Sequence, residues 1–358
     1  MRIAVDAQSV EGQKTGIGVF AGNLMEAMAQ EAPDIQWLRY TRASGKDLNP
    51  LERVFWESVS IPLKVLRDKP DWVYSPGFAP AFFSPVPQLV TVHDLIGKIY
   101  PGNQPAAARA YWSWWLPNAL KKARKLVASS ESTRSDLERF LGISPRKVKV
   151  VPLSAHASFR KLENSKEARE VLLKYNIRSP FLISVGTIEP RKNHLGLLEA
   201  YQKIREKAGA LFKLVIVGKP GGAERDVEGF IEEKDLGEHV KILGYVPGED
   251  LTALYNAALG YAFVSFYEGF GLPALEAMSC GKSGVASKRS SIPEVVGDTA
   301  ILVDPENTGE IAEAMLTFVS DNSLRQTLSD RAYARSKDFS TRKTARSMIG
   351  IFKNEAFP

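Results

Sequence analysis

The sequence has few of the residues that disulfides and metal centres need. Its 358 residues include one cysteine and four histidines. No internal disulfide can form, and the usual cysteine and histidine spacings of zinc sites do not occur. There is also no D-x-D pair, a carboxylate arrangement that often holds a divalent cation. We therefore expect neither a structural nor a catalytic metal.

Long apolar segments are missing as well. No run of about 18 apolar residues could form a membrane-spanning helix. The opening residues, MRIAVDAQSV, lack the basic region followed by an apolar region that a signal peptide has. Together with the single cysteine, these features predict a cytoplasmic protein. They leave peripheral contact with the inner face of the plasma membrane open.

Basic residues are in modest excess. The chain has 47 Lys and Arg against 41 Asp and Glu, which gives a formal net charge of +6. Such a charge favours anionic partners, and nucleotide phosphates, lipid head groups and nucleic acid all meet that description. The basic residues form no recognised nucleic-acid-binding motif, so we do not expect nucleic acid as a partner.

The chain is longer than one hydrophobic core usually serves, which predicts two domains. Short apolar segments alternate with amphipathic stretches in both halves, a pattern typical of parallel sheets with helices on both faces. In the first half the expected strands are Arg2–Val5, Ile35–Tyr40, Trp72–Tyr74, Leu89–Val92, Leu126–Ala128 and Val148–Val151. In the second half they are Phe181–Val185, Leu214–Val217, Val240–Leu243, Tyr261–Val264, Gly284–Ala286 and Ile301–Val303.

The two halves meet at a polar stretch, His156–Lys166. We expect an α/β protein of two Rossmann-like domains, one over residues 1–158 and the other over residues 159–339. The last segment, Thr341–Lys353, has a helical pattern but follows a break, so we expect residues 340–358 to return to the first domain. In open α/β sheets ligands bind beyond the carboxyl ends of the strands, and the loops at those ends are the candidate sites.

The segment Tyr267–Met278, YEGFGLPALEAM, follows the strand expected at Tyr261–Val264. Its glycines, Gly269 and Gly271, allow the backbone to approach a ligand closely. Pro273 suits the first turn of a helix, whose free N–H groups attract phosphate. The segment therefore combines a glycine loop with a helix N-terminus at the expected ligand edge.

Two carboxylates belong to the same segment. Glu268 lies in the loop, and Glu276 lies one turn into the helix. A carboxylate there can accept hydrogen bonds from sugar hydroxyls. The alternative is that Glu276 only favours the helix N-terminus electrostatically. The glycines, the proline and the preceding strand favour the binding role.

This E-x7-E motif with an internal GFG resembles that of the family-4 retaining glycosyltransferases, and the resemblance covers essentially the whole chain. It implies the GT-B fold, in which two Rossmann-like domains face each other across a cleft. It also implies that Glu268 contacts the transferred sugar and that Glu276 binds the ribose of a nucleotide-sugar donor, which is a substrate rather than a cofactor. The other residues of the motif that it assigns to donor binding are Gly269, Phe270, Gly271 and Leu272.

A second motif, Val185–Asn193, has the sequence VGTIEPRKN and is expected to close a strand and open a helix. Beside a helix N-terminus, Arg191 and Lys192 can neutralise a pyrophosphate leaving group, and a solvated basic turn is the alternative. The resemblance is to the branch of the family with an E-P-R-K-N pattern. Many family members carry an arginine where Thr187 stands here, and we expect Arg191 to replace it.

In the first half, Thr15–Val19 (TGIGV) places Gly16 and Gly18 before a helix expected at Phe20–Ala29. Such a loop can lie against phosphate or sugar, and a plain tight turn has the same pattern. The resemblance implies that both glycines belong to the donor site.

The segment Leu89–Leu95, LVTVHDL, puts His93 and Asp94 at the end of a strand. A histidine there can reach a ligand or simply satisfy a local hydrogen bond. The resemblance implies that His93 contacts the donor sugar and takes part in catalysis. We expect Asp94 to orient the local backbone.

Aromatic and basic side chains are interleaved in Arg109–Lys125, RAYWSWWLPNALKKARK. This pattern is typical of a helix lying in a membrane interface. An aromatic face packed in the core, followed by a basic helix end, has the same periodicity and is the alternative. We expect Pro117 to interrupt a single long helix. For a lipid-linked acceptor, this segment is the expected contact with an anionic membrane.

Together these features predict a retaining glycosyltransferase that works without a metal. No base is paired to a nucleophile, so we expect front-face transfer, in which Arg191 and Lys192 stabilise the departing diphosphate. The E-P-R-K-N branch resembles bacterial enzymes that assemble O-antigen and exopolysaccharide repeats. This implies a mannosyltransferase that uses GDP-mannose and a lipid-linked glycan or oligosaccharide acceptor. UDP- and dTDP-sugars stay open as donors.

Two other classes of protein stay open. A sugar-nucleotide epimerase of the same fold would form product without any acceptor. A noncatalytic protein that binds nucleotide-sugars or polyanions would need only the positive charge.

Overall fold

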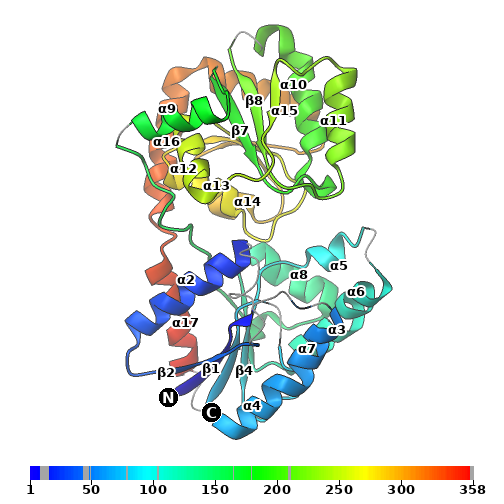
Figure 1. Ribbon diagram of the computed structural model, residues 1–358, viewed down its shortest axis with the longest axis vertical. Coiled ribbons are helices and arrows are strands. Elements are labelled where there is room, and N and C mark those ends of the chain that lie inside the picture. Colours follow the sequence, from blue (N-terminus) through cyan, green and yellow to red (C-terminus); the bar gives the residue numbers. More distant parts are fainter. Residues whose placement is uncertain are drawn as a thin grey trace. The chain divides into compact units, whose positions relative to one another are not determined.

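The computed structural model describes residues 1–8, 16–42, 48, 50–77, 80–102, 105–163, 165–178, 180–208 and 211–354. The chain forms two compact units, shown in Figure 1. The first unit is Met1–His156 with Phe339–Pro358, and the second is Ala157–Asp338. Each unit contains a six-stranded parallel sheet.

The strands of the first unit are β1 (Arg2–Asp6), β2 (Gln36–Tyr40), β3 (Trp72–Ser75), β4 (Gln88–Val92), β5 (Lys125–Ala128) and β6 (Val148–Val150). Their order in the sheet is β2-β1-β3-β4-β5-β6. The α-helices are α2 (Gly16–Glu31), α3 (Pro50–Phe55), α4 (Ile61–Asp68), α5 (Ile96–Ile99), α6 (Ala106–Ala110), α7 (Leu116–Lys122), α8 (Glu131–Leu141) and α17 (Thr341–Asn354). Two π-helical turns, η1 (Trp56–Ser60) and η2 (Tyr111–Trp115), and a 3-10 turn, η3 (Pro145–Lys147), complete the unit.

The strands of the second unit are β7 (Phe181–Val185), β8 (Lys213–Val217), β9 (Val240–Ile242), β10 (Gly260–Phe263), β11 (Gly284–Ser287) and β12 (Ile301–Val303). Their order is β12-β11-β10-β7-β8-β9. The helices are α9 (Ser165–Lys174), α10 (His194–Ala208), α11 (Glu224–Glu233), α12 (Gly248–Ala257), α13 (Leu272–Ser279), α14 (Ile292–Val296), α15 (Thr308–Ser320) and α16 (Asn322–Ser336), with a 3-10 turn, η4 (Pro190–Lys192).

Helices cover both faces of the first sheet. Successive side chains of a strand point to opposite faces. On β3, Trp72 and Tyr74 contact Phe352 of α17, whereas Val73 packs with Ile61 of α4. A strand buried on both faces needs apolar side chains throughout, which explains the continuous apolar runs of the sequence.

The second unit has its own core. Leu182 of β7 and Leu214 of β8 pack with Leu197 of α10 and Met315 of α15. The α/β prediction is confirmed, and each of the twelve expected strands is present with its ends within one residue of the expected position. In the described part of the chain, no helix has the length and apolar character needed to span a bilayer.

The predicted start of the first helix is wrong. The first helix begins at Gly16 rather than at Phe20, so Gly16 and Gly18 lie in its first turn and not in a loop before it. At Pro117 the helical run 106–122 continues, but it is not one regular α-helix: the π-helical turn η2 ends just before the proline, which lacks the N–H of an interior helix position. The π-turn η2 leads directly into α7.

The last helix is held to the first unit by both charge and aromatic packing. Arg342 and Arg346 of α17 each pair with Glu31 at 2.6 Å. Phe352 is fully buried and packs edge-on against Trp72, with the ring centroids 5.7 Å apart. Because the charged pairs are largely exposed, the aromatic contact contributes most of the stabilisation.

We predict that Phe352→Ala lowers the free energy of unfolding of the first unit by about 3–5 kcal/mol, because it leaves a cavity among aromatic rings. Urea unfolding of the full chain, followed by tryptophan fluorescence, measures the change. Phe140→Ala, at a site 37% exposed on α8, is the matched control and should change the stability little. Equal effects of the two substitutions would contradict the packing argument.

Candidate functional site

The two sequence motifs of the second unit meet at the carboxyl ends of adjacent strands. β7 and β10 are neighbours in the sheet, and the turn η4 follows β7 while the loop to α13 follows β10. The backbone N–H of Phe266 in that loop donates to the carbonyl of Arg191 in the turn at 2.8 Å. The sheet therefore brings together segments that are more than 70 residues apart in sequence.

Glu268 lies between the two cations of the other motif. Arg191 Nη1 donates to Glu268 Oε2 at 3.0 Å, and Lys192 Nζ donates to Glu268 Oε1 at 2.5 Å. Ser265 Oγ donates to Oε1 at 2.8 Å. Arg191 also pairs with Glu189 at 2.6 Å. The alternative of a solvated basic turn does not hold, because the side chains of Arg191 and Lys192 are only 13% and 10% exposed.

The charges of this cluster determine the ionisation of Glu268. Burial alone would raise the pKa of the carboxyl group. The positive charges of Lys192 and Arg191, with the hydrogen bonds from Lys192 and Ser265, outweigh burial and hold the pKa of Glu268 below its ordinary value. Glu268 is therefore ionised at neutral pH, and it lies buried in contact with both cations.

The backbone of Glu268 is fixed by a third loop, which sequence reasoning missed. Ser290 Oγ and Ser291 Oγ both donate to the carbonyl of Glu268, at 2.6 and 2.9 Å. Ser290 has a positive φ of 55°, a conformation that non-glycine residues seldom adopt and that often marks functional sites. The two serines follow β11, the other neighbour of β10. Their position directly after an apolar strand was the sequence feature that could have identified them as site residues.

Asn193 sets the start of α10 beside the cations. It has a positive φ of 58°, and its Oδ1 accepts from the N–H of Gly196 at 3.2 Å, as a helix N-cap does. Its Nδ2 donates to the carbonyls of Val264 and Pro305 at 3.1 and 2.6 Å. Asn193 thus fixes the turn to two neighbouring loops, and its position ahead of a helical pattern was a recognisable capping signal.

Close backbone packing positions Lys192. A Cβ atom on Gly186 would lie 3.0 Å from Lys192 Cε, and one on Gly218 would lie 1.8 Å from the carbonyl oxygen of Gly186. Only glycine fits at position 218, because the obstructing atom belongs to the backbone. The Lys192 side chain therefore lies along the backbone at the end of β7.

The helix α13 begins where the sequence predicted it. Gly271 is its N-cap residue with φ of 107°, and Pro273 stands in the first turn. Glu276 is partly buried, and its Oε2 accepts from Tyr255 Oη at 3.4 Å. Burial raises the pKa of Glu276 to about 7, although the Tyr255 hydrogen bond and the charge of Lys192 lower it. The charge of Lys192 thus acts on both carboxylates of the E-x7-E motif.

The predicted residues of the first unit have local hydrogen bonds. His93 is buried after β4, and its Nε2 donates to the carbonyl of Pro76 at 2.8 Å. Burial lowers the pKa of His93 to about 4, so the ring is neutral near pH 7. Asp94 Oδ1 accepts a hydrogen bond from the N–H of Ile96 at 2.9 Å, so this carboxylate orients the local backbone. Gly18 is buried in α2.

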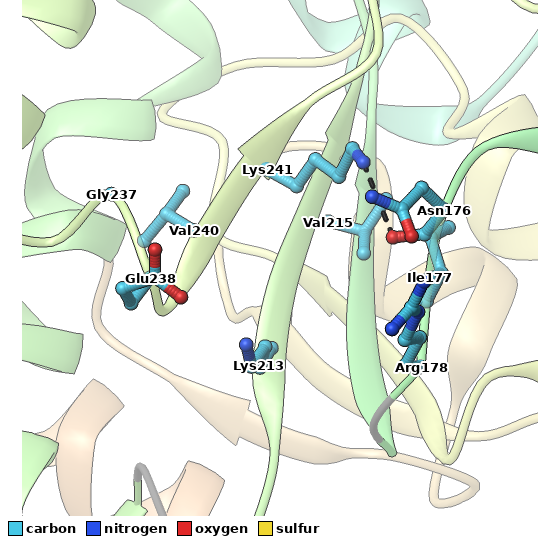
Figure 2. Close-up of a pocket in the computed structure, with 9 residues that line it drawn as sticks. All are labelled: Asn176, Ile177, Arg178, Lys213, Val215, Gly237, Glu238, Val240 and Lys241. Carbon is cyan, nitrogen blue, oxygen red and sulfur yellow. Dashed lines mark hydrogen bonds between the residues drawn. The ribbon is translucent and has the colours of Figure 1, made fainter.

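Two pockets of the second unit lie at opposite ends of its strands, and one of them is far from the motifs. The pocket in Figure 2, of about 440 Å³, is lined by Lys213 at the start of β8 and Val240 at the start of β9. It therefore lies at the amino ends of the strands, opposite the motifs. Another pocket, of about 420 Å³, lies beside η4 and is lined by Glu189, Asn193 and His194.

The aromatic segment 109–125 is mostly packed inward. Tyr111 is buried, Trp115 stacks on Phe82 with the centroids 4.4 Å apart, and Trp112 packs over Gly97. Only Trp114, of these aromatic residues, is well exposed, at 60%. The described residues hold no group of three or more His, Cys, Asp or Glu side chains that could bind a metal ion.

The fold and the strand-end motifs are those of a two-domain enzyme of the GT-B class. The family model "Glycosyl transferases group 1" matches residues 165–335, and "Glycosyltransferase Family 4" matches residues 16–155. The O-antigen chain mannosyltransferase B of Escherichia coli is 32% identical over 292 residues, which are 80% of this chain and 76% of that protein. The chain therefore belongs to the family of group 1 and family-4 glycosyltransferases, and it is a glycosyltransferase.

Further similarities concern a longer protein and a solved structure. The serotype-specific mannosyltransferase WbdA of Escherichia coli is 30% identical over 65% of this chain, but the match spans only 29% of WbdA. The structure of sucrose-phosphate synthase from Thermosynechococcus elongatus aligns with a TM-score of 0.79 over 99% of both chains, at 20% identity. This likeness concerns the fold.

We predict that the ion cluster makes the stability of the second unit depend on pH. The folded pKa of Glu268 is lowered, so its contribution is complete above the ordinary glutamate pKa and is lost as the pH falls through the folded value. At pH 7, Glu268→Gln should reduce the free energy of unfolding by about 3 kcal/mol, because it breaks a buried pair. The difference should shrink between pH 5 and pH 3, as urea unfolding can measure.

The matched control is Glu306→Gln, which removes the carboxylate of an exposed pair with Arg289. It should change the stability little at any pH in this range. A Glu268→Gln difference that is constant with pH would contradict the assignment of the charge to Glu268.

Proposed function

We propose that the protein transfers mannose from GDP-mannose, with retention of configuration, to a lipid-linked glycan during assembly of a bacterial surface polysaccharide. The contact of Arg191 and Lys192 with Glu268 at the carboxyl ends of β7 and β10 carries this proposal. The names of the relatives, an O-antigen chain mannosyltransferase and a serotype-specific mannosyltransferase, support the donor sugar and the pathway class.

In this proposal, Arg191 and Lys192 bind the diphosphate of the donor. Two cations in a poorly solvated site stabilise the negative charge that develops on a departing diphosphate more strongly than they would in water. They supply the charge that a metal ion supplies in other enzymes, so we propose that transfer needs no metal. Glu189 remains paired with Arg191 and holds its guanidinium group in place.

Glu268 has two roles. Its carboxylate positions both cations, and as an ionised acceptor it can bind a hydroxyl group of the transferred sugar. The adjacent residues Gly269, Phe270, Gly271 and Leu272 lead into α13 and place backbone beside the same sugar. Fixing the sugar and the diphosphate through one side chain favours the aligned geometry that transfer needs.

Glu276 binds the ribose hydroxyl groups of the nucleotide. Its carboxyl group lies one turn into α13 and contacts Tyr255 only through a long hydrogen bond of 3.4 Å. His93 is the residue of the first unit that we assign to the donor sugar. Its Nε2–H donates to Pro76, so Nδ1 is the acceptor nitrogen of a neutral ring.

The chemical step is a front-face transfer. The acceptor hydroxyl attacks the anomeric carbon on the side from which the diphosphate leaves, and a phosphate oxygen takes the hydroxyl proton. Configuration is retained because both bonds lie on the same face of the sugar. The acceptor is lipid-linked in this proposal, which requires the protein to work at an anionic membrane surface.

We predict that Glu268→Ala lowers the rate of mannose transfer at least about a hundredfold, since removal of one preorganised polar group commonly costs that much. The measurement is incorporation of labelled mannose from GDP-mannose into a lipid-linked oligosaccharide fraction. Glu228→Ala, on the exposed surface of α11, is the matched control and should keep full activity. Formation of a new sugar nucleotide without acceptor would instead favour an epimerase.

A second prediction concerns Glu276. Its pKa of about 7 implies that the fraction of ionised acceptor rises between pH 6 and pH 8. Affinity for GDP, measured by calorimetric titration, should increase over this range in the wild type. In Glu276→Gln the affinity for GDP should increase less over this range. Titration of the GDP phosphates affects both proteins equally, so the difference between them is the contribution of Glu276. Identical pH profiles would rule out the ribose contact.

A further inference from the structure

One helical run of the first unit carries large apolar side chains on its exposed side as well as on its buried side. The run α3–η1–α4 covers residues 50–68 without a break. Its inner face buries Trp56, Ile61 and Val65 against the sheet. Its outer face exposes large apolar side chains, which are Phe55 (59%), Val59 (37%), Leu63 (61%) and Leu66 (59%).

The spacing of the exposed residues is that of one helix face. Steps of four, four and three residues place Phe55, Val59, Leu63 and Leu66 in a single stripe along the helix. Isolated exposed leucines are common on protein surfaces, but a continuous row of large apolar side chains is not. This apolar stripe therefore indicates a surface that is covered when the protein works.

The apolar stripe runs into a groove with cations at its edge. The groove, of about 690 Å³, is lined by Leu66 of α4, by Phe82 and Phe83, by Lys122 at the end of α7, and by Arg124 directly before β5. Lys122 Nζ lies 3.8 Å from the ring centroid of Phe82 and 4.5 Å from that of Phe83. No Asp or Glu is among the described residues that line this groove.

The elements on either side of the groove are fastened together below the surface. Trp115 Nε1 of η2 donates to Glu57 Oε2 of η1 at 3.1 Å, and Tyr111 Oη donates to Oε1 at 3.4 Å. Trp115 in turn stacks on Phe82. The aromatic residues of the 109–125 segment thus support the surface from within, and Trp114 alone of them extends it.

We propose that the apolar stripe and the cationic groove together dock the protein on an anionic phospholipid membrane. The stripe enters the boundary between head groups and acyl chains, while Lys122 and Arg124 bind lipid phosphates. Apolar side chains flanked by cations, with no acidic residue in the groove, match this chemistry. This proposal rests on the proposed function, because docking on a membrane would give the enzyme access to a lipid-linked acceptor. It places the apolar part of the membrane contact on the outer face of residues 50–68 and keeps Lys122 and Arg124, from the segment 109–125, as its cationic part.

The test is co-sedimentation of the full chain with vesicles of phosphatidylglycerol mixed with phosphatidylcholine, and with vesicles of phosphatidylcholine alone. Leu63→Ser with Leu66→Ser should weaken binding to the anionic vesicles about a hundredfold, near tenfold for each leucine that leaves the bilayer. The matched control is Leu173→Ser on α9, where the side chain is 78% exposed, and it should bind like the wild type.

Charge is tested separately from apolar contact. Lys122→Gln with Arg124→Gln should lower the preference for anionic over neutral vesicles roughly tenfold or more. Unchanged binding by the leucine variant, or no binding by the wild type, would overturn the proposal. Unchanged vesicle binding together with loss of a dimer in light scattering would assign the apolar stripe to a second copy of the chain.

Binding of GDP separates this proposal from the proposed function. The leucine variant should bind GDP like the wild type, because the apolar stripe contains no residue that we assign to the donor. Loss of vesicle binding with GDP binding intact supports the docking surface. A wild type that binds vesicles but no nucleotide would overturn the proposed function and leave the docking surface standing.

Discussion

The buried carboxylate of Glu268 is the group on which the site depends. An isolated charge in this position would be costly, because burial removes it from water. Lys192 and Arg191 compensate that cost directly, at 2.5 and 3.0 Å, and Ser265 supplies a further hydrogen bond. The cluster joins the loops after β7 and β10, so a change in any one charge disturbs two segments of the site. In the proposed function, the same cations also bind the diphosphate of the donor.

The loops around this cluster are tied to one another by hydrogen bonds from side chains to backbone carbonyls. Asn193 caps α10 and reaches two neighbouring loops, and Ser290 and Ser291 hold the carbonyl of Glu268 from the loop after β11. Three adjacent strands thus contribute to one arrangement of charges. Such preorganisation reduces the reorganisation needed when charge develops on a leaving group. The positive φ angles of Asn193 and Ser290 are the local strain that this arrangement carries.

The strands could be predicted well from the sequence, because a strand buried on both faces has apolar residues at nearly every position. Sequence reasoning also located both motifs and the start of α13. It missed the pairing of Lys192 with Glu268, since contacts between segments 76 residues apart depend on strand order, which the pattern of runs does not specify. The outer stripe at Leu63 and Leu66 was missed for a different reason: the run 50–68 mixes apolar with charged residues, and its sequence does not show which apolar side chains face the sheet and which face solvent.

Calorimetric titration of GDP, UDP and dTDP into the full chain, with and without magnesium, tests the central claim most directly. We expect GDP to bind most tightly, magnesium to have no effect, and Lys192→Ala to weaken binding at least tenfold, because that substitution removes a cation from the diphosphate. Lys166→Ala, a 77% exposed lysine of α9, should bind GDP like the wild type. Absence of nucleotide binding in the wild type, or equal binding by the Lys192 and Lys166 variants, would contradict the account.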